Sequence, residues 1–586
     1  MRRLVLFVTV LSLAVLLTDV NADEERQFQQ FWMQYNTDFH DSDRFAEALE
    51  MLDTAEDAGV THMILNERGM HRWDMVQESY RADVARFREA ADQRDIVIVP
   101  NIFPIGYGIR YLVHDVNMAA GIPAENVPFI VRGDTALPDP AAVPQLVNPS
   151  LDEAEGHRLV GWRQDGPGTI TFVDTTEKHS GTASLQIRAP QEGQRAVAGR
   201  ITQTVEVEPF KYYRLSFWVK TEQARPAGAS FAVVWTHDRR RRNTYFNVSI
   251  AGTQDWTRHD VVFNTLDADS ADIVIGPGNF RTGTMWIDSI SIEPAGILNV
   301  VRRELAPLTV TSADGEVVYD EGRDFEHVHD PQFIYSNLAS IDHEGAPIRI
   351  TEGSRIRDGE RILVSYYHTM RIYNDQVVLT LSDPILFEYM ERQMEHIAEL
   401  WESTIYFMSA DEIRIAGWEH QPDGEDLSVA QMLARYMERS YDIVGRHSPD
   451  SRIAVWSDMF TPFHNGRPLE ERGPYFLCTG SFYNSWAGLP RDVLIMNWYS
   501  PNRLTPVWFE VRGHEQVLCG YYDTDDLKAN IAHWMNVTRG VDNIVGMMYT
   551  QWFTGHERMK EFFELVGDYP NWLKGPEASR AVTSEQ

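Results

Sequence analysis

Two adjacent carboxylates, Asp411 and Glu412, directly follow the apolar run of residues 404–410. Successive residues that leave a strand point in different directions, so one carboxylate can face a reacting bond while the other supports the substrate. The like charge of Asp411 and nearby tryptophans would favour a neutral acid at Glu412, as general acid catalysis requires. The alternative is an ordinary helix start, because acidic residues favour a first helical turn.

Further carboxylate, amide and aromatic side chains lie where other strands are expected to end. Stability alone does not require such side chains at so many strand ends, and flat aromatic rings are common platforms for sugar faces. The pattern therefore favours an active site for a sugar substrate. The candidate substrate-binding residues are Glu67, Asn101, Trp456, Asp458, Trp498, Tyr499, Asp523 and Trp552.

Short apolar strands that alternate with helical patterns position these residues. The expected strands span residues 30–36, 61–66, 96–101, 404–410, 452–457, 492–498, 516–521 and 544–549. This alternation predicts an α/β fold, a (β/α)8 TIM barrel built from residues 23–145 and 371–575. Such barrels carry their active sites at the C-terminal ends of the strands, which is where the candidates lie.

A long insertion interrupts the barrel after its third strand. Residues 146–294 alternate in hydrophobicity between turn residues, which predicts an all-β jelly-roll sandwich. Short motifs at 148–152, 179–185 and 285–288 resemble those of carbohydrate-binding modules. Residues 295–370 are expected to form an excursion beside the barrel mouth. Candidate sugar platforms in the sandwich are Trp162, Trp235 and Trp256, with core packing as the alternative.

Residues 1–22 have the pattern of a cleaved signal peptide, with Arg2 and Arg3 before an apolar run that is short for a membrane span. The protein is therefore expected to be secreted or periplasmic, with an uncleaved N-terminal anchor as the alternative. A net charge of −33 disfavours nucleic acid and anionic membranes as partners. In a secreted chain Cys478 and Cys519 could pair, but buried free thiols are an equal alternative. Residues 576–586 are expected to form a flexible tail.

The sequence contains no fingerprint of a cofactor. It has no phosphate-binding loop, no dinucleotide-binding motif after a strand, and no Cys/His cluster with zinc spacing. The expected partner is therefore an oligosaccharide or polysaccharide substrate, with no cofactor and no catalytic metal. The oligomeric state is left open.

The barrel resembles that of glycoside hydrolase family 20, the hexosaminidases and their relatives. The similarity lies in Asp411-Glu412 after strand four, Trp456-x-Asp458 after strand five, Trp498-Tyr499 after strand six, and Trp552 after strand eight. It implies that Glu412 is the general acid/base and that Asp411 orients the 2-acetamido group of the substrate. It further implies that Tyr499 binds the acetamido oxygen and that the tryptophans wall the pocket.

The chain departs from the family pattern at three points, and other mechanisms stay open. The family's small α+β domain ahead of the barrel has no room before Phe31. Ser409-Ala410 stand where the family has Gly-Gly, and the family's Glu after the last Trp is missing, because Phe553 follows Trp552. A second hypothesis is a retaining glycosidase with Glu412 as acid and Asp523 as nucleophile. A third is a non-catalytic glycan-binding protein. The long loops after strand three favour exo action on a terminal sugar.

Overall fold

The computed structural model describes residues 28–190, 195–226, 231–236, 241–246, 248–373, 376–498 and 503–572. The expected signal peptide, the expected tail and Tyr499 lie outside these ranges. Within them, no helix has the length and apolar character needed to cross a membrane.

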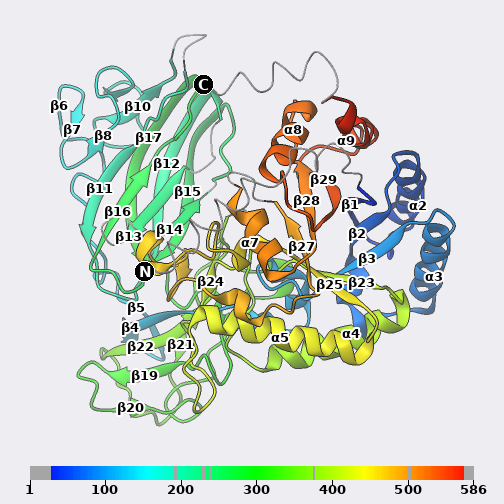
Figure 1. The fold of residues 1–586 in the computed structure, drawn as a ribbon. Coiled ribbons are helices and arrows are strands. Elements are labelled where there is room, and N and C mark those ends of the chain that lie inside the picture. The colour runs from blue at the N-terminus through cyan, green and yellow to red at the C-terminus, as the bar shows by residue number, and fades with distance from the viewer. Residues whose placement is uncertain are drawn as a thin grey trace, which may run out of the picture.

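Eight parallel strands close into a barrel in the order β1-β2-β3-β23-β25-β27-β28-β29 (Figure 1). The strands are β1 (Gln30–Thr37), β2 (His62–Glu67), β3 (Val97–Ile102), β23 (Ile405–Met408), β25 (Arg452–Trp456), β27 (Leu494–Asn497), β28 (Gln516–Tyr521) and β29 (Ile544–Thr550). The predicted eight parallel strands are therefore confirmed. Side chains on one face of every strand fill the interior, including Trp32, Val99, Phe407 and Met548.

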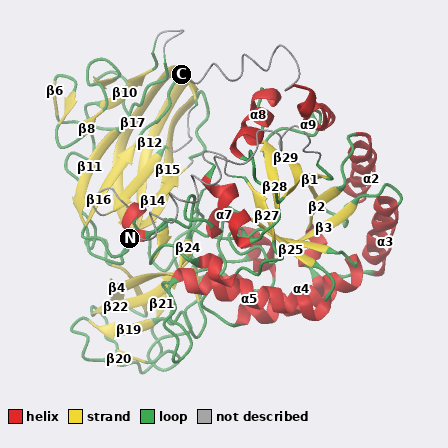
Figure 2. Ribbon diagram, in the orientation of Figure 1, coloured by secondary structure: helices red, strands yellow, loops and turns green. Residues whose placement is uncertain are grey.

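Amphipathic helices flank the barrel strands (Figure 2). They are α2 (Ser42–Asp57), α3 (Glu78–Asp92), α4 (Ile385–Trp401), α5 (Val429–His447), the short α6 (Leu469–Arg472), α7 (Leu504–Arg512), α8 (Leu527–Val537) and α9 (Met559–Trp572). Helix α5 shows why they form where they do. Ser428 and Gln431 make a reciprocal capping box at its start. Its buried side chains, such as Leu433 and Met437, recur at helical spacing.

The insertion contains a sandwich of two five-stranded antiparallel sheets, ordered β15-β12-β17-β10-β9 and β14-β13-β16-β11-β8. Alternate residues of the long central strand, Leu215, Phe217 and Val219, enter the shared core. The strands are β8 (Arg163–Gln164), β9 (Thr171–Asp174), β10 (Ser184–Arg188), β11 (Ile201–Glu206), β12 (Tyr212–Arg225), β13 (Ala232–Thr236), β14 (Arg241–Phe246), β15 (Gln254–Asn264), β16 (Ser270–Ile275) and β17 (Thr282–Pro294). The predicted β-sandwich is confirmed.

A third sheet corrects the expected domain boundaries. Residues 122–138, assigned above to the barrel, pair instead with strands of the excursion in the order β20-β19-β22-β4-β5-β21, with β18 beside β22. The strands of this sheet therefore come from the segments before and after the sandwich in the sequence. Its strands are β4 (Ile122–Arg132), β5 (Thr135–Pro138), β18 (Val300–Val301), β19 (Thr309–Ser312), β20 (Val318–Tyr319), β21 (Ile348–Arg349) and β22 (Arg361–His368).

Both cysteines are buried and free. Cys519 lies on β28 inside the barrel, and Cys478 lies on the short strand β26 (Leu477–Cys478), which pairs with β24 (Ile415–Ala416). The disulfide alternative is therefore wrong.

A buried histidine joins the sandwich to the third sheet. His368 of β22 stacks on Tyr212 with 3.5 Å between ring centroids. The side-chain amide of Asn264 donates to His368 Nε2 at 2.9 Å, so this nitrogen must be unprotonated. Burial lowers the pKa of His368 to about 3. The contact therefore depends on the neutral imidazole.

This interface is expected to weaken in acid. A histidine with a lowered folded-state pKa costs stability as the pH falls from its unfolded pKa of about 6.5 towards the folded value, by up to about 1.4 kcal/mol per pH unit. His368→Gln keeps an acceptor for Asn264 but does not titrate. Between pH 7 and pH 5, the melting temperature of the wild type should therefore fall further than that of His368→Gln. Parallel curves would contradict this prediction.

Candidate active site

The Glu412 carboxylate lies beyond the end of β23 between two donors. Tyr107 donates its hydroxyl to Oε2 at 2.5 Å, and Arg414 forms an ion pair with Oε1 at 2.8 Å. The Arg414 side chain is only 4% exposed and lies over the rings of Tyr373 and Phe476, with 4.8 and 5.1 Å to their centroids. Burial opposes the charge of Arg414, yet the nearby Glu412 carboxylate leaves its pKa above the usual value. Glu412 itself keeps 23% of its side-chain surface exposed, so it can meet a ligand.

Two further carboxyl groups lie beside Glu412. Asp458 is buried and accepts hydrogen bonds from the Glu412 backbone N–H, the Asn465 amide and the Trp498 indole at 3.1, 2.8 and 3.3 Å. Burial, reinforced by the charge of Glu412, raises the pKa of Asp458 to about 6. Burial and the charges of Asp458 and Glu412 raise the pKa of Asp411 well above its usual value. Both aspartates therefore take up a proton more readily than free carboxyl groups do.

Aromatic side chains form a continuous wall next to these carboxyl groups. The Trp498 indole, which donates to Asp458, stacks on Tyr522 at 6.1 Å between centroids. Tyr522 meets Trp552 at 6.1 Å, and Trp552 lies 6.3 Å from Trp456. Trp456 is buried among the barrel-interior side chains, so it supports the wall from below. Trp552 is 46% exposed and offers an open ring. The structure thus brings the three predicted tryptophans together.

Asp523 is engaged in holding the loop that carries Trp552. Its carboxylate accepts from the backbone N–H groups of Trp552, Phe553 and Thr554, at 2.9 Å for Trp552, and from the Thr554 hydroxyl at 2.6 Å. Partial burial acts in the opposite direction, but these hydrogen bonds lower the pKa of Asp523. Both oxygens are occupied, which disfavours Asp523 as a nucleophile.

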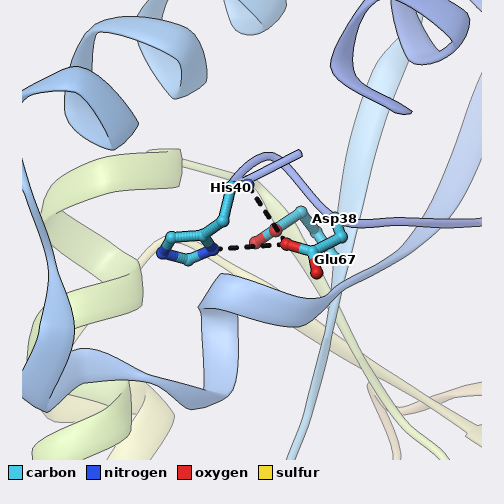
Figure 3. A group of neighbouring side chains, drawn as sticks. All are labelled: Asp38, His40 and Glu67. Carbon is cyan, nitrogen blue, oxygen red and sulfur yellow. Dashed lines mark hydrogen bonds and ion pairs between the residues drawn. The ribbon is translucent and has the colours of Figure 1, made fainter. Parts of the chain in front are cut away.

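Glu67 is fully buried, and its hydrogen bonds hold the surrounding backbone in place. Three backbone N–H groups and the Tyr80 hydroxyl donate to its carboxylate, the hydroxyl at 2.6 Å. Among the described residues, Asp38, His40 and Glu67 form a group close enough to share a metal ion (Figure 3). Arg68 already pairs with Asp38 at 3.3 Å, however, and the donors around Glu67 saturate its oxygens. This chemistry fits a hydrogen-bonded cap better than a metal site.

Asn101 faces the interior of the barrel, on the same side of β3 as Val97 and Val99. Its amide nitrogen donates to the side-chain oxygen of Asn66 on the neighbouring strand. The Asn101 side-chain oxygen is buried without a hydrogen-bond partner among the described residues. It therefore belongs to the polar interior of the barrel, and nothing places it against Glu412.

The candidate platforms of the sandwich differ in burial. Trp162 is buried in the sandwich core and donates its indole N–H to the backbone oxygen of Asn148 at 3.1 Å. Trp256 is half-buried and donates to Glu177 at 3.0 Å. Trp235, on β13, is half-buried as well. The core alternative therefore holds for Trp162.

Sequence reasoning missed five residues that complete the site: Tyr107, Gln376, Arg414, Asn465 and Tyr522. Arg414 had a usable signal, because it lies two residues after Glu412 and a cation near an acidic pair is informative. Tyr522 directly precedes Asp523 and could have been included with it. Gln376 had no signal, because it comes from the segment that returns from the insertion.

Comparison with known proteins identifies part of the insertion. Residues 145–278 match the family model described as "Carbohydrate binding domain". This confirms the predicted carbohydrate-binding-type module for those residues. A comparison with curated protein sequences finds no match for the chain. The matched residues lie outside the barrel strands, so the resemblance to family 20 stays a prediction.

Two similar solved structures each match about a quarter of this chain. "Family 16 Carbohydrate Binding Module-2" is 20% identical, with 25% of this chain and 97% of that chain covered and a TM-score of 0.18. The CBM22-1 xylan-binding domain from Paenibacillus barcinonensis Xyn10C is 18% identical, with 28% and 96% covered and a TM-score of 0.20.

Proposed function

We propose that this chain is a secreted glycoside hydrolase, with a (β/α)8 TIM barrel as its catalytic domain and Glu412 as general acid/base. The observation that carries the proposal is the setting of Glu412. It is a partly exposed carboxylate between a phenol and a guanidinium, beside two carboxyl groups with raised pKa values and close to a wall of aromatic rings. Acid/base chemistry beside an aromatic platform suits the cleavage of a bond between sugars.

The proposed mechanism is substrate-assisted and acts on a terminal N-acetylated sugar. Glu412 protonates the leaving oxygen while the acetamido oxygen of the substrate attacks the anomeric carbon, and Glu412 then takes a proton from the incoming water. Asp411 Oδ1 is buried and has no hydrogen-bond partner among the described residues. In this proposal it accepts the acetamido N–H once the substrate displaces the side chains that cover it. Tyr499, expected to bind the acetamido oxygen, belongs to this proposal from its sequence position alone.

The inserted sandwich is proposed to hold the glycan near the barrel. Support comes from the match of residues 145–278 to a carbohydrate-binding domain. The interface through His368, Asn264 and Tyr212 fixes the sandwich against the third sheet, so a bound chain would be presented in a defined direction.

The experiment that tests the proposal is hydrolysis of a panel of 4-nitrophenyl glycosides by the wild type and Glu412→Gln. We expect release from N-acetylhexosaminides that depends on Glu412. Release only from sugars without an acetamido group would contradict the substrate-assisted mechanism and favour the two-carboxylate mechanism. An absence of release, combined with binding on a glycan array, would favour a non-catalytic glycan-binding protein.

Asp523 separates the substrate-assisted mechanism from the two-carboxylate mechanism. Asp523→Asn weakens the hydrogen bonds that hold the Trp552 loop. In the substrate-assisted mechanism, this substitution removes no reacting group. We therefore expect KM to rise about 10-fold while kcat falls less than about 10-fold, since the loss of a substrate-positioning contact costs roughly 1–2 kcal/mol. Steady-state kinetics would show this. A collapse of kcat by several orders of magnitude, with KM unchanged, would restore Asp523 as nucleophile.

A further inference from the structure

The backbone that carries Glu412 is held in an unusual conformation. Ala410 and Glu412 have φ values of +46° and +47°, in the left-handed region that residues with a side chain rarely adopt. Such conformations persist only where surrounding contacts determine them. The hydrogen bond from Glu412 N–H to Asp458 is one such contact. A second must act on the carbonyl side of Glu412.

Gln376 supplies that second contact and reaches three parts of the site at once. Its amide nitrogen donates to the backbone oxygens of Glu412 and Gly106, each at 2.8 Å. Its side-chain oxygen accepts from Arg414 Nη1 at 2.5 Å. The residue is 1% exposed, so water does not compete for these bonds. Every polar atom of the side chain is thus committed to the Glu412 loop or to the loop that packs on it.

The packing leaves little freedom at this junction. A Cβ added to Gly106 would lie 2.1 Å from the backbone oxygen of Asp411, so the two loops touch directly. Tyr107, the next residue, donates to the Glu412 carboxylate. Gln376 therefore fixes, through one amide group, the backbone of Glu412, the loop that brings Tyr107, and the arginine that pairs with Glu412.

We propose that Gln376 is the positioning residue through which the returning end of the insertion sets the geometry of Glu412. This inference rests on the proposed function of Glu412 as acid/base. It gives the insertion a role in catalysis that is separate from glycan binding, because the segment that leads from it back into the barrel supplies the group that orders the reactive loop.

The test compares Gln376→Ala and Gln376→Glu with Gln393→Ala. Gln376→Glu preserves shape, but its carboxylate cannot donate to the two backbone oxygens and competes with Glu412 for Arg414. Gln393 is an equally buried glutamine on α4 that bonds Met70, Phe103, Tyr111 and His71, and none of these bonds involves Glu412 or Arg414. Gln393→Ala therefore controls for the loss of a buried amide.

We expect kcat on the preferred glycoside to fall about 30- to 100-fold in both Gln376 variants, as for a misplaced reacting group, with KM within about threefold. Gln393→Ala should change kcat less than threefold. Hydrogen exchange at the amides of residues 409–416 should also quicken in the Gln376 variants and not in Gln393→Ala. This second readout requires no activity.

The two readouts separate the failure of this inference from the failure of the proposed function. Unchanged exchange together with unchanged kcat would overturn the role of Gln376. Equal losses in Gln376→Ala and Gln393→Ala would reduce it to general stability and overturn it too. If the wild type hydrolyses no glycoside, the proposed function fails. Faster exchange at residues 409–416 in the Gln376 variants alone would then still show that Gln376 orders the Glu412 loop, whereas unchanged exchange would overturn that role as well.

Discussion

Glu412→Gln is expected to lower kcat/KM for an unactivated oligosaccharide about 10³-fold, within the range of 10²–10⁴ that general acid/base catalysis contributes. The amide has nearly the same shape, so packing around Tyr107 and Arg414 should survive. It can neither give a proton to the leaving oxygen nor take one from water. The loss should therefore fall on the chemical steps, and KM should change little.

The leaving group sharpens this prediction. A 4-nitrophenolate leaves readily without protonation, so cleavage of 4-nitrophenyl glycosides should suffer less than that of an oligosaccharide if Glu412 is the acid. Glu425→Gln is the matched control, because Glu425 is exposed, lies later in the same loop and pairs with Arg435. Wild-type rates in Glu412→Gln on both substrates would remove Glu412 from the mechanism. An equal loss on both would favour a role as base or nucleophile over one as acid.

The barrel could be predicted because its strands are short apolar runs, each close in sequence to a helical pattern. Neighbouring barrel strands share one alternation of side chains between the barrel interior and the helices, and this alternation sets the register between them. The third sheet could not be predicted in this way. Strand β4 pairs with β22, more than 200 residues later, and the whole sandwich lies between them. Two prolines, Pro123 and Pro128, further obscure the strand pattern of β4.

The candidate site likewise combines features that the local sequence shows with contacts between distant segments that it does not show. The Asp411-Glu412 pair and the tryptophans were visible as residue types at strand ends. The role of Asp523 was not, because its partners are backbone N–H groups of the loop after β29, which carry no residue signature. Burial likewise decided which carboxyl groups have raised pKa values, and these are Asp411 and Asp458.

Arg303→Met is expected to destabilise the fold by about 3–5 kcal/mol, the cost of leaving a buried charge without its partner. Arg303, from the insertion, forms an ion pair with Glu419, from the loop that follows Glu412 in the barrel. Their side chains are 10% and 3% exposed. Glu419 also accepts from the Gly121 N–H at 2.6 Å, and Arg303 donates to the Ala119 oxygen at 3.0 Å.

Denaturant unfolding would measure the loss, with Arg302→Met as the control. Arg302 is the neighbouring arginine and pairs with the more exposed Glu321, so its removal should cost no more than about 1 kcal/mol. The double variant Arg303→Met/Glu419→Leu should recover part of the stability, because it removes the buried charge of Glu419 as well. Recovery should be incomplete, because Asp383, which lies 3.3 Å from Arg303 Nε, also loses its arginine. If the double variant is no better than Arg303→Met alone, the stabilising contribution lies in the hydrogen bonds of Arg303 to backbone oxygens. In that case the insertion is joined to the barrel by its shape and backbone contacts, with the buried charges contributing little.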